Sequence, residues 1–368
     1  MTDGPLTEQR VLELLAGLAD PETGRNIVQA GQVHQLKVDG QHLQITLGLT
    51  THSAPLWNET RQQVLDLLEK HFPQAHCAVE LAVHARPAPR TGELALPVKT
   101  VVAVGSGKGG VGKSSVAACL AYGLRRAGSH VGLLDADLYG PSIPQLLGIH
   151  QQPRFSNGRI EPLEVDGLNV MSIGLLIPRQ EAVIWRGPML HSALRQLLGD
   201  TDWGELDYLI VDLPPGTGDV AISLSQLVPT AAAVVVCTPQ DVALLDATRA
   251  ITMFRRMNME ILGMVENMSF FICTNCNARH EVFGCGGAKR RAAELGVAFL
   301  GELPLVTQLR VLGDEGRLTE AFGLPGVKEY LEELCRQLVR EIADRRRRNP
   351  HMPTLPIVDR PFPRQSET

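Results

Sequence analysis

The sequence has no apolar run approaching the roughly 18 residues that a membrane-spanning helix needs. Its first residues, MTDGPLTEQR, contain no basic region followed by an apolar stretch, so we expect no signal peptide. These two absences predict a cytoplasmic location. The chain has only seven cysteines, too few in 368 residues for a disulfide scaffold. In a reducing compartment a tight cysteine pair more often binds metal or performs redox chemistry.

The chain also lacks an excess of basic charge. Its formal net charge is −5 at pH 7, so bulk electrostatics give no reason to expect binding to nucleic acid or to a membrane. Hydrophobic residues make up 44% of the chain, which is enough for a sizeable core. A length of 368 residues is typical of two domains, or of one large domain with additions.

Residues 1–85 are predicted to form a small α/β domain. They contain two segments of helical periodicity, at 8–18 and 57–72, and alternating segments typical of strands. The turn-forming pair Asp39-Gly40 lies between two of the alternating segments and predicts a hairpin. Prolines then interrupt the pattern, so residues 86–98 are predicted to be a linker.

Residues 99–345 have a different sequence pattern, in which short apolar runs alternate with polar turns and helical segments. Such runs predict a mostly parallel sheet that is flanked by helices on both faces. The ligand of such a sheet lies beyond the carboxyl ends of its strands. We expect the last residues, 346–368, to be a disordered tail. The runs are VVAV (101–104), VGLL (131–134), YLIV (208–211), AAVVVC (232–237) and ILGMV (261–265).

The segment GSGKGGVGKSS, residues 105–115, contains the phosphate-binding pattern G-x-x-x-x-G-K-S/T between an apolar strand and a helical segment. Its glycines let backbone amides surround phosphate oxygens, and the helix N-terminus adds a favourable dipole. The sequence therefore predicts an α/β P-loop NTPase fold that binds ATP and Mg²⁺. We expect Lys113 at the β- and γ-phosphates and Ser114 on Mg²⁺. The predicted nucleotide contacts in this loop are Gly107, Lys108, Gly109, Gly110, Val111, Gly112, Lys113, Ser114 and Ser115.

Acidic residues follow two of the other predicted strands. Asp212 ends an apolar strand, the usual place for a carboxylate that holds the Mg²⁺ shell. The turn at 214–218 comes next and is suited to sensing the γ-phosphate. Asp135 and Asp137 follow the second strand, where they can order Mg²⁺-bound water or the attacking water. A turn-capping role is the alternative for Asp137.

Four segments in this order resemble the Mrp/ApbC family of iron–sulfur cluster carrier ATPases: GKGGVGKSS, DADLYGPSIP, VDLPPGTGD, and ENMSFFICTNC followed by FGCGG. The likeness covers roughly residues 99–340. That family belongs to the deviant Walker A group, with the MinD and ParA ATPases and the nitrogenase iron protein. The resemblance implies an ATPase that holds a labile cluster at a homodimer interface. It also implies transfer of the cluster to apo-proteins, with cluster assembly factors as further partners.

The resemblance also assigns roles to particular residues. It implies that Lys108, the second lysine of the loop, reaches across the dimer to the nucleotide of the other copy. It implies that Asp137 orders the hydrolytic water and that Asn267 lies near the adenine. From the residues alone, a solvated surface role for Lys108 remains open.

The N-terminal segment LADPETGRNIVQAGQV resembles the small domain of cytosolic iron–sulfur assembly factors. That domain often has a cysteine in a T…CP stretch, whereas this chain has Ala54 before Pro55. We therefore expect a structural or docking role for residues 1–85, and no thiolate ligand from them.

Cys273 and Cys276 form a C-x-x-C pair, whose spacing lets two thiolates bind one metal or cluster. A 4Fe–4S cluster usually takes four thiolates, so two copies of the chain would complete the set. A zinc site within one chain is an alternative, because His280 and Cys285 extend the pair to C-x2-C-x3-H-x4-C. A redox pair and a metal-free pair are further alternatives.

Three other functions stay open at this point. A positioning ATPase of the MinD/ParA kind would share the loop and Lys108 but would not need the cysteine pair. Such an ATPase normally has a membrane-binding tail or a DNA-binding face, and the C-terminal segment here is broken by prolines. A reductase component would keep a stable cluster for electron transfer. A zinc-stabilised nucleotide-binding module is the third alternative.

Overall fold

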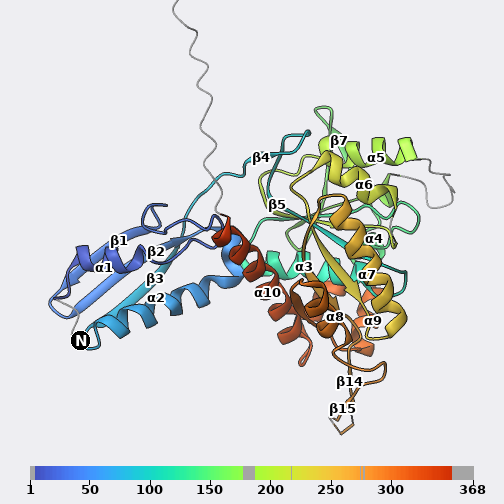
Figure 1. The fold of residues 1–368 in the computed structure, drawn as a ribbon. Coiled ribbons are helices and arrows are strands. Elements are labelled where there is room, and N and C mark those ends of the chain that lie inside the picture. Colours follow the sequence, from blue (N-terminus) through green and yellow to red (C-terminus); the bar gives the residue numbers. More distant parts are fainter. Residues whose placement is uncertain (1–4, 177–186, 217, 274, 277, 350–368) are drawn as a thin grey trace, which may run out of the picture.

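The structure is a computed structural model that describes residues 5–176, 187–216, 218–273, 275–276 and 278–349. Its N-terminal domain has a three-stranded sheet in the order β1-β2-β3, in which β1 and β2 are antiparallel and β2 and β3 are parallel (Figure 1). Apolar side chains of both long helices pack on this sheet around Ile45 and Leu47. The elements are α1 (Glu8–Leu15), β1 (Val33–Asp39), β2 (His42–Leu49), the 3-10 helix η1 (Thr51–Leu56), α2 (Trp57–His71) and β3 (His76–Val83).

The second domain is built on a nine-stranded sheet in the described part of the chain. Five predicted apolar runs form neighbouring parallel strands of it, which confirms the predicted sheet. The sheet order is β16-β13-β12-β5-β11-β6-β10-β9, with β4 beside β5. Its strands are β4 (Arg90–Thr91), β5 (Leu96–Ser106), β6 (Val131–Asp135), β9 (Leu163–Val165), β10 (Leu168–Ser172), β11 (Leu206–Asp212), β12 (Ala232–Cys237), β13 (Glu260–Glu266) and β16 (Phe299–Glu302).

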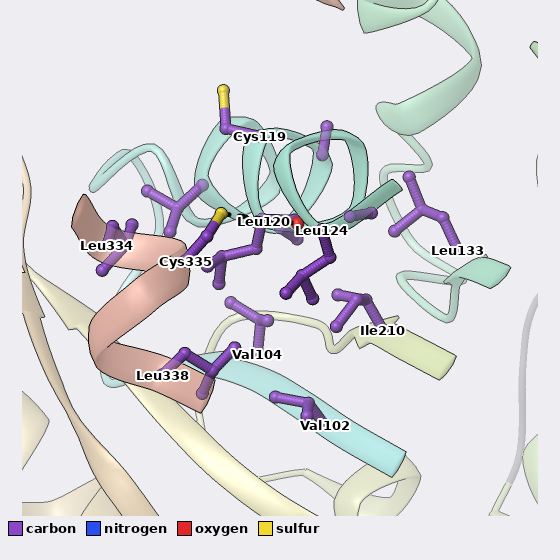
Figure 2. Packing of buried hydrophobic residues seen from close by; sticks show 14 of the residues in the cluster. Val102, Val104, Cys119, Leu120, Leu124, Leu133, Ile210, Leu334, Cys335 and Leu338 are labelled. Atoms are coloured by element: carbon purple, nitrogen blue, oxygen red, sulfur yellow. Dashed lines mark hydrogen bonds between the residues drawn. The ribbon is translucent and has the colours of Figure 1, made fainter. Parts of the chain in front are cut away.

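Helices cover both faces of this sheet because its central strands are apolar on both sides. Val102 and Val104 of β5 face a core shared with α3 and α10, which Figure 2 shows in close-up. Val101 and Ala103 of the same strand face the opposite core, which contains apolar residues of α5, α6 and α7. The helices are α3 (Lys113–Ala127), α4 (Ile143–Leu146), α5 (Gly187–Gly199), α6 (Asp219–Leu227), α7 (Asp241–Arg256), α8 (Gly287–Leu295), α9 (Thr307–Asp314) and α10 (Lys328–Arg348).

Short elements complete the fold. Two small hairpins lie outside the main sheet, and two 3-10 turns connect longer elements. Within the described residues, no helix combines the length and the apolar character that a membrane span requires. The short elements are β7 (Arg154–Ser156), β8 (Arg159–Glu161), η2 (Ile173–Leu175), β14 (Phe271–Ile272), β15 (Arg279–His280) and η3 (Leu318–Gly323).

The predicted domain boundaries stay predictions, although the structure adds detail around them. The predicted linker, residues 86–98, includes β4 and the first residues of β5, which pair with each other. Helix α10 includes residues 346–348 of the predicted tail. The rest of that tail, from residue 350, lies outside the described residues.

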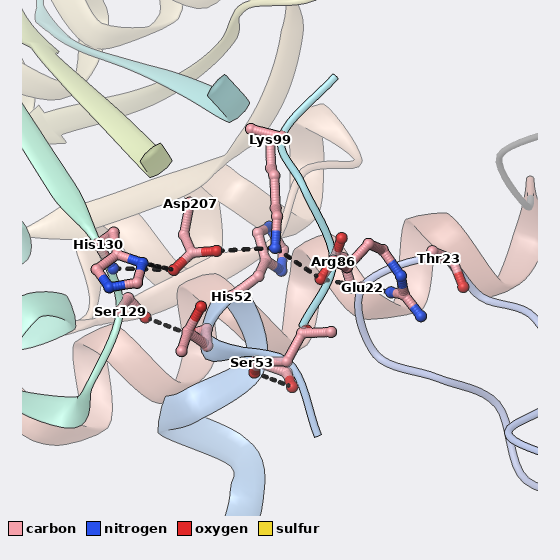
Figure 3. A network of polar contacts seen from close by, with 12 residues as sticks. Glu22, Thr23, His52, Ser53, Arg86, Lys99, Ser129, His130 and Asp207 are labelled. Carbon is pink, nitrogen blue, oxygen red and sulfur yellow. Dashed lines mark hydrogen bonds and ion pairs between the residues drawn. The ribbon is translucent and has the colours of Figure 1, made fainter. Parts of the chain in front are cut away.

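A buried polar network joins the two domains (Figure 3). Lys99, at the start of β5, forms ion pairs with Glu22 of the N-terminal domain and with Asp207 of β11. Both acids and Lys99 are almost completely buried. These ion pairs connect the start of β5 to the N-terminal domain on one side and to β11 on the other. The Ser129 hydroxyl adds a 2.7 Å hydrogen bond to the Thr51 carbonyl.

His52 lies at the centre of this contact. Its ring stacks on Tyr208 of β11 with 4.5 Å between ring centroids, and its Nε2 lies 3.0 Å from Thr100 Oγ1. Its Nδ1 is buried and has no hydrogen-bond partner among the described residues. Burial lowers the pKa of His52 to about 4.

We predict that acidification weakens the fold through His52. Below its unfolded pKa of about 6.5 the unfolded chain binds a proton that the folded chain rejects, so stability falls as the pH drops towards 4. The full difference between the unfolded and folded pKa values of His52 corresponds to about 3 kcal/mol of unfolding free energy. Urea unfolding across this range should show the slope in the wild type and a reduced slope in His52→Gln. Replacing the exposed His42 by Gln is the control, and an unchanged slope in His52→Gln would contradict the prediction.

Candidate functional site

The predicted phosphate loop runs from the end of β5 at Ser106 to the start of α3 at Lys113. Gly112 has φ +78°, and a Cβ at this position would lie 2.3 Å from the Asn267 Nδ2 atom. A Cβ on Gly107 would lie 2.2 Å from the main-chain oxygen of Asp246 in α7. The loop therefore needs glycine at both positions. Gly112 is required by its positive φ and by the lack of space, and Gly107 is required by the lack of space alone.

Lys113 and Asp212 form a buried ion pair beneath this loop. The Lys113 ammonium also lies 3.2 Å from the Ser114 hydroxyl. Burial raises the pKa of Asp212, and the nearby Lys113 opposes this shift. The second carboxylate oxygen of Asp212 is buried without a hydrogen-bond partner among the described residues. A free carboxylate oxygen beside a serine hydroxyl fits a hydrated Mg²⁺, which prefers oxygen ligands and keeps several waters.

The two acids after β6 occupy different environments. Asp135 pairs in register with Asp212, and its carboxylate accepts hydrogen bonds of 3.1 Å each from the Asp137 amide, the Ile143 amide and the Ser172 hydroxyl. Burial, and then the charge of Asp212, raises the pKa of Asp135 to about 8. Asp135 thus shapes the loop after β6. Its predicted contact with the nucleotide and magnesium shell stays a prediction.

A cavity of about 270 Å³ lies above the phosphate loop. Asp137 contributes to its wall, and its carboxylate also accepts a 3.2 Å hydrogen bond from the Gly140 amide. Lys108 lines the same cavity, and its carbonyl accepts a 2.9 Å hydrogen bond from Ser106 Oγ. The predicted loop residues Gly109, Gly110, Gly112, Lys113, Ser114 and Ser115 line the cavity as well.

A second cavity of about 430 Å³ adjoins the first. Asp137 and Pro215 line both cavities, so the two meet at the loops that follow β6 and β11. The predicted γ-phosphate turn, 214–218, lies here, although its Thr217 is outside the described residues.

Asn267 supports the phosphate loop directly. Its side-chain Nδ2 donates a 2.8 Å hydrogen bond to the carbonyl of Val111, and its own amide donates to the Cys237 carbonyl. The side chain is almost fully buried. The predicted contact between Asn267 and an adenine stays a prediction, and the structure adds a contact with the loop that the sequence pattern did not indicate.

Cys273 and Cys276 lie on the connection between β14 and β15, a hairpin that projects from the second domain in Figure 1. The Cys273 amide donates a 2.9 Å hydrogen bond to the Ala278 carbonyl, which closes the hairpin around the pair. The amides of Asn275 and Cys276, and then the Cys276 thiol, lower the pKa of Cys273. A lowered pKa favours the thiolate, the form of cysteine that binds metals. Thr274 and Asn277 lie outside the described residues.

The two further residues of the possible zinc set are not gathered with the pair. His280 lies on β15 opposite Phe271 and is exposed. The Cys285 thiol hydrogen-bonds to Glu281, which raises its pKa. Among the residues that the structure describes, no three His, Cys, Asp or Glu side chains are placed to hold one metal ion. A tetrahedral zinc site within one chain therefore has no geometric support here.

Two protein families match separate parts of this chain. The sequence pattern of the NUBPL iron-transfer P-loop NTPases matches residues 97–342, and that of an iron–sulfur cluster assembly protein matches residues 8–81. An iron–sulfur cluster carrier protein of Deinococcus radiodurans is 43% identical over 90% of this chain and 93% of its own length. An iron–sulfur cluster transfer protein NUBPL of Dictyostelium discoideum is 44% identical over 67% of this chain and 77% of its own length.

Among solved structures, a nucleotide-binding protein of Archaeoglobus fulgidus in complex with ADP is 41% identical to this chain. The match covers 61% of this chain and 88% of that protein, with a TM-score of 0.55. This structural likeness agrees with the P-loop NTPase fold predicted from residues 105–115.

We predict different effects for alanine at two glycines of the loop. Gly112→Ala should lower the free energy of unfolding by about 1–3 kcal/mol, because alanine is strained at positive φ and its Cβ would displace Asn267. Gly109→Ala should cost less than about 1 kcal/mol, because nothing lies within 4 Å of the added Cβ. Denaturant unfolding of both variants measures the difference, and equal losses would contradict this account of Gly112.

Proposed function

This chain belongs to the NUBPL iron-transfer P-loop NTPase family, and we propose that it is an ATP-hydrolysing carrier that binds a labile 4Fe–4S cluster between two copies. It would transfer the cluster to apo iron–sulfur proteins in the cytosol. One observation carries this proposal. The phosphate loop and the Cys273/Cys276 hairpin follow strands β5 and β13 of one parallel sheet, and Asn267 of the β13 segment binds the loop.

ATP hydrolysis in this proposal uses groups that line the cavity, together with Asp212 beneath the loop. A water attacks the γ-phosphorus, the bond to the leaving ADP oxygen breaks, and Asp137 accepts the proton that the water loses. Lys113 neutralises charge on the β- and γ-phosphates, for which it exchanges its pairing with Asp212. Ser114 and Asp212 would hold Mg²⁺, which when bound stabilises negative charge on the phosphate oxygens. Lys108 of a second copy would add positive charge at the transferred phosphoryl group.

The proposed dimer uses the carboxyl edge of the sheet. Most large apolar side chains that the described residues expose lie in segments that follow the carboxyl ends of β6, β11, β12 and β13. Exposed apolar side chains collected on one face mark protein contact sites. A second copy docked there would place both phosphate cavities and both cysteine hairpins near the interface. These side chains are Tyr139, Ile222, Val242, Leu245, Val282 and Phe283.

The cluster assignment follows from ligand number. Cys273 and Cys276 supply two thiols per chain, both accessible to solvent, and the lowered pKa of Cys273 favours its thiolate. A 4Fe–4S cluster takes four thiolates, which two hairpins provide. A site on exposed hairpins of two separable chains is also suited to releasing its cargo, because few protein groups enclose it.

We expect the cysteine pair to determine iron binding. After anaerobic reconstitution, the wild type should hold about two irons and two sulfides per chain, and Cys273→Ala/Cys276→Ala should hold almost none. Cys285→Ala is the matched control, since it removes a neighbouring thiol outside the pair and should leave the iron content unchanged. Equal iron in the double variant and the wild type would contradict the proposal.

Lys108 provides a separate test of hydrolysis across the dimer. Lys108→Ala should lower kcat for ATP hydrolysis by about 100-fold and change the Kd for ATP by less than about threefold. The reason is that a charge supplied by the second copy acts mainly on the transition state. Steady-state hydrolysis and equilibrium nucleotide binding measure the two effects. If kcat and the affinity for ATP fall by similar factors, Lys108 is an ordinary phosphate ligand of its own chain.

A further inference from the structure

Glu266 is a fully buried carboxylate at the end of β13, between the nucleotide site and the cysteine hairpin. Its Oε1 accepts a 3.1 Å hydrogen bond from the Gly286 amide, and its Oε2 accepts one of 2.7 Å from the Ala288 amide. These amides belong to the start of α8, immediately after Cys285. A carboxylate at a helix N-terminus is stabilised by the free amides and the helix dipole. Glu266 therefore fixes the segment that follows the cysteine hairpin and leads into α8.

The residue that follows Glu266 is fixed to the phosphate loop. Asn267 donates to the Val111 carbonyl over 2.8 Å, and there is no room for a Cβ on Gly112 beside its amide nitrogen. A movement of the loop around bound phosphates would therefore displace Asn267. Glu266 and Asn267 are joined by one peptide bond. A displacement of Asn267 would therefore also move Glu266, whose carboxylate holds the segment between the hairpin and α8.

A second connection leads from the same segment to the other side of the hairpin. The Ser269 hydroxyl lies 2.6 Å from Glu266 Oε1 and 3.0 Å from Glu302 Oε2, and it has one proton to share between them. Glu302 in turn accepts two hydrogen bonds from Arg279, at 3.1 and 3.3 Å. The Arg279 guanidinium also stacks on the Phe270 ring, 3.8 Å from its centroid.

Arg279 belongs to β15 and pairs in register with Ile272, the residue before Cys273. Its two hydrogen bonds to one carboxylate fix direction as well as distance. Of the side chains described on this hairpin, that of Arg279 is therefore positioned to set how the hairpin stands on the sheet.

We propose that the contacts from Asn267 through Glu266, Ser269 and Glu302 to Arg279 couple the nucleotide state of the phosphate loop to the position of Cys273 and Cys276. Arg279 is the positioning residue at the end of this path. This inference rests on the proposed function, and it names how ATP acts on the cluster site. Coupling between two sites is reciprocal, so an occupied hairpin would also change the affinity for ATP.

Hydrogen exchange on the full chain without iron tests the path by itself. A non-hydrolysable ATP analogue with Mg²⁺ should change the exchange rate of amides in 271–286 by about fivefold or more in the wild type. Arg279→Ala should bind the analogue with unchanged Kd and lose this change, and Arg279→Lys should retain part of it. Arg310→Ala, which removes a comparable exposed ion pair with Asp314 on α9, is the control and should behave as the wild type.

A second readout uses the loaded protein. Release of iron to a chelator should differ by about fivefold or more between ATP-analogue and ADP states of the wild type, and be nearly equal in Arg279→Ala. Glu302→Gln should give the same result if Arg279→Ala does not fold. A full nucleotide response in folded Arg279→Ala or Glu302→Gln, or no response of the wild-type hairpin to the analogue, overturns the inference. A wild type that binds no iron while its hairpin responds would instead overturn the proposed function alone.

Discussion

Parallel strands direct their carboxyl ends to the same edge of a sheet, and the whole site depends on this constraint. The ends of β5, β6, β11 and β13 bring the phosphate loop, two acidic segments and the cysteine hairpin to one edge, although more than 150 residues separate the loop from the hairpin. The long apolar strands that build the sheet are stable only because helices cover both of its faces. The site therefore inherits the placement of its loops from the core.

The sequence was sufficient for the parts of the fold that follow from local pattern. Apolar runs such as 208–211 and 232–237 predicted buried parallel strands, because fully apolar strands have no stable place elsewhere. The phosphate loop could be predicted from its sequence pattern, because glycines at fixed positions are what lets the backbone amides surround a phosphate. The cysteine pair was likewise visible from spacing alone.

Other features of the site depend on residues that only the folded chain brings together. The contacts of Glu266 with the α8 amides and of Arg279 with Glu302 join segments 20–23 residues apart and have no sequence signature. The contact of Asn267 with Val111 spans 156 residues. Asp135 is a further example, because the three hydrogen-bond donors around its carboxylate come from segments whose contacts have no sequence signature.

The N-terminal domain docks on the edge of the nine-stranded sheet opposite the site. Lys99, Thr100 and Tyr208, near the starts of β5 and β11, and Ser129, after the end of α3, contact it, and the opposite ends of these elements carry the phosphate loop and Asp212. Ala54 lies near the end of α3, because a Cβ added to Gly128 would be 3.7 Å from the Cβ of Ala54. Ala54 therefore lies where the two domains meet.

In the proposed function, two chains share one cluster through their paired cysteines. Native mass spectrometry of the protein reconstituted without oxygen, in the presence of the ATP analogue, measures the composition of the complex directly. The account predicts a species of two chains with one 4Fe–4S cluster. A single chain that carries a cluster or a zinc ion, with no two-chain species, would contradict it.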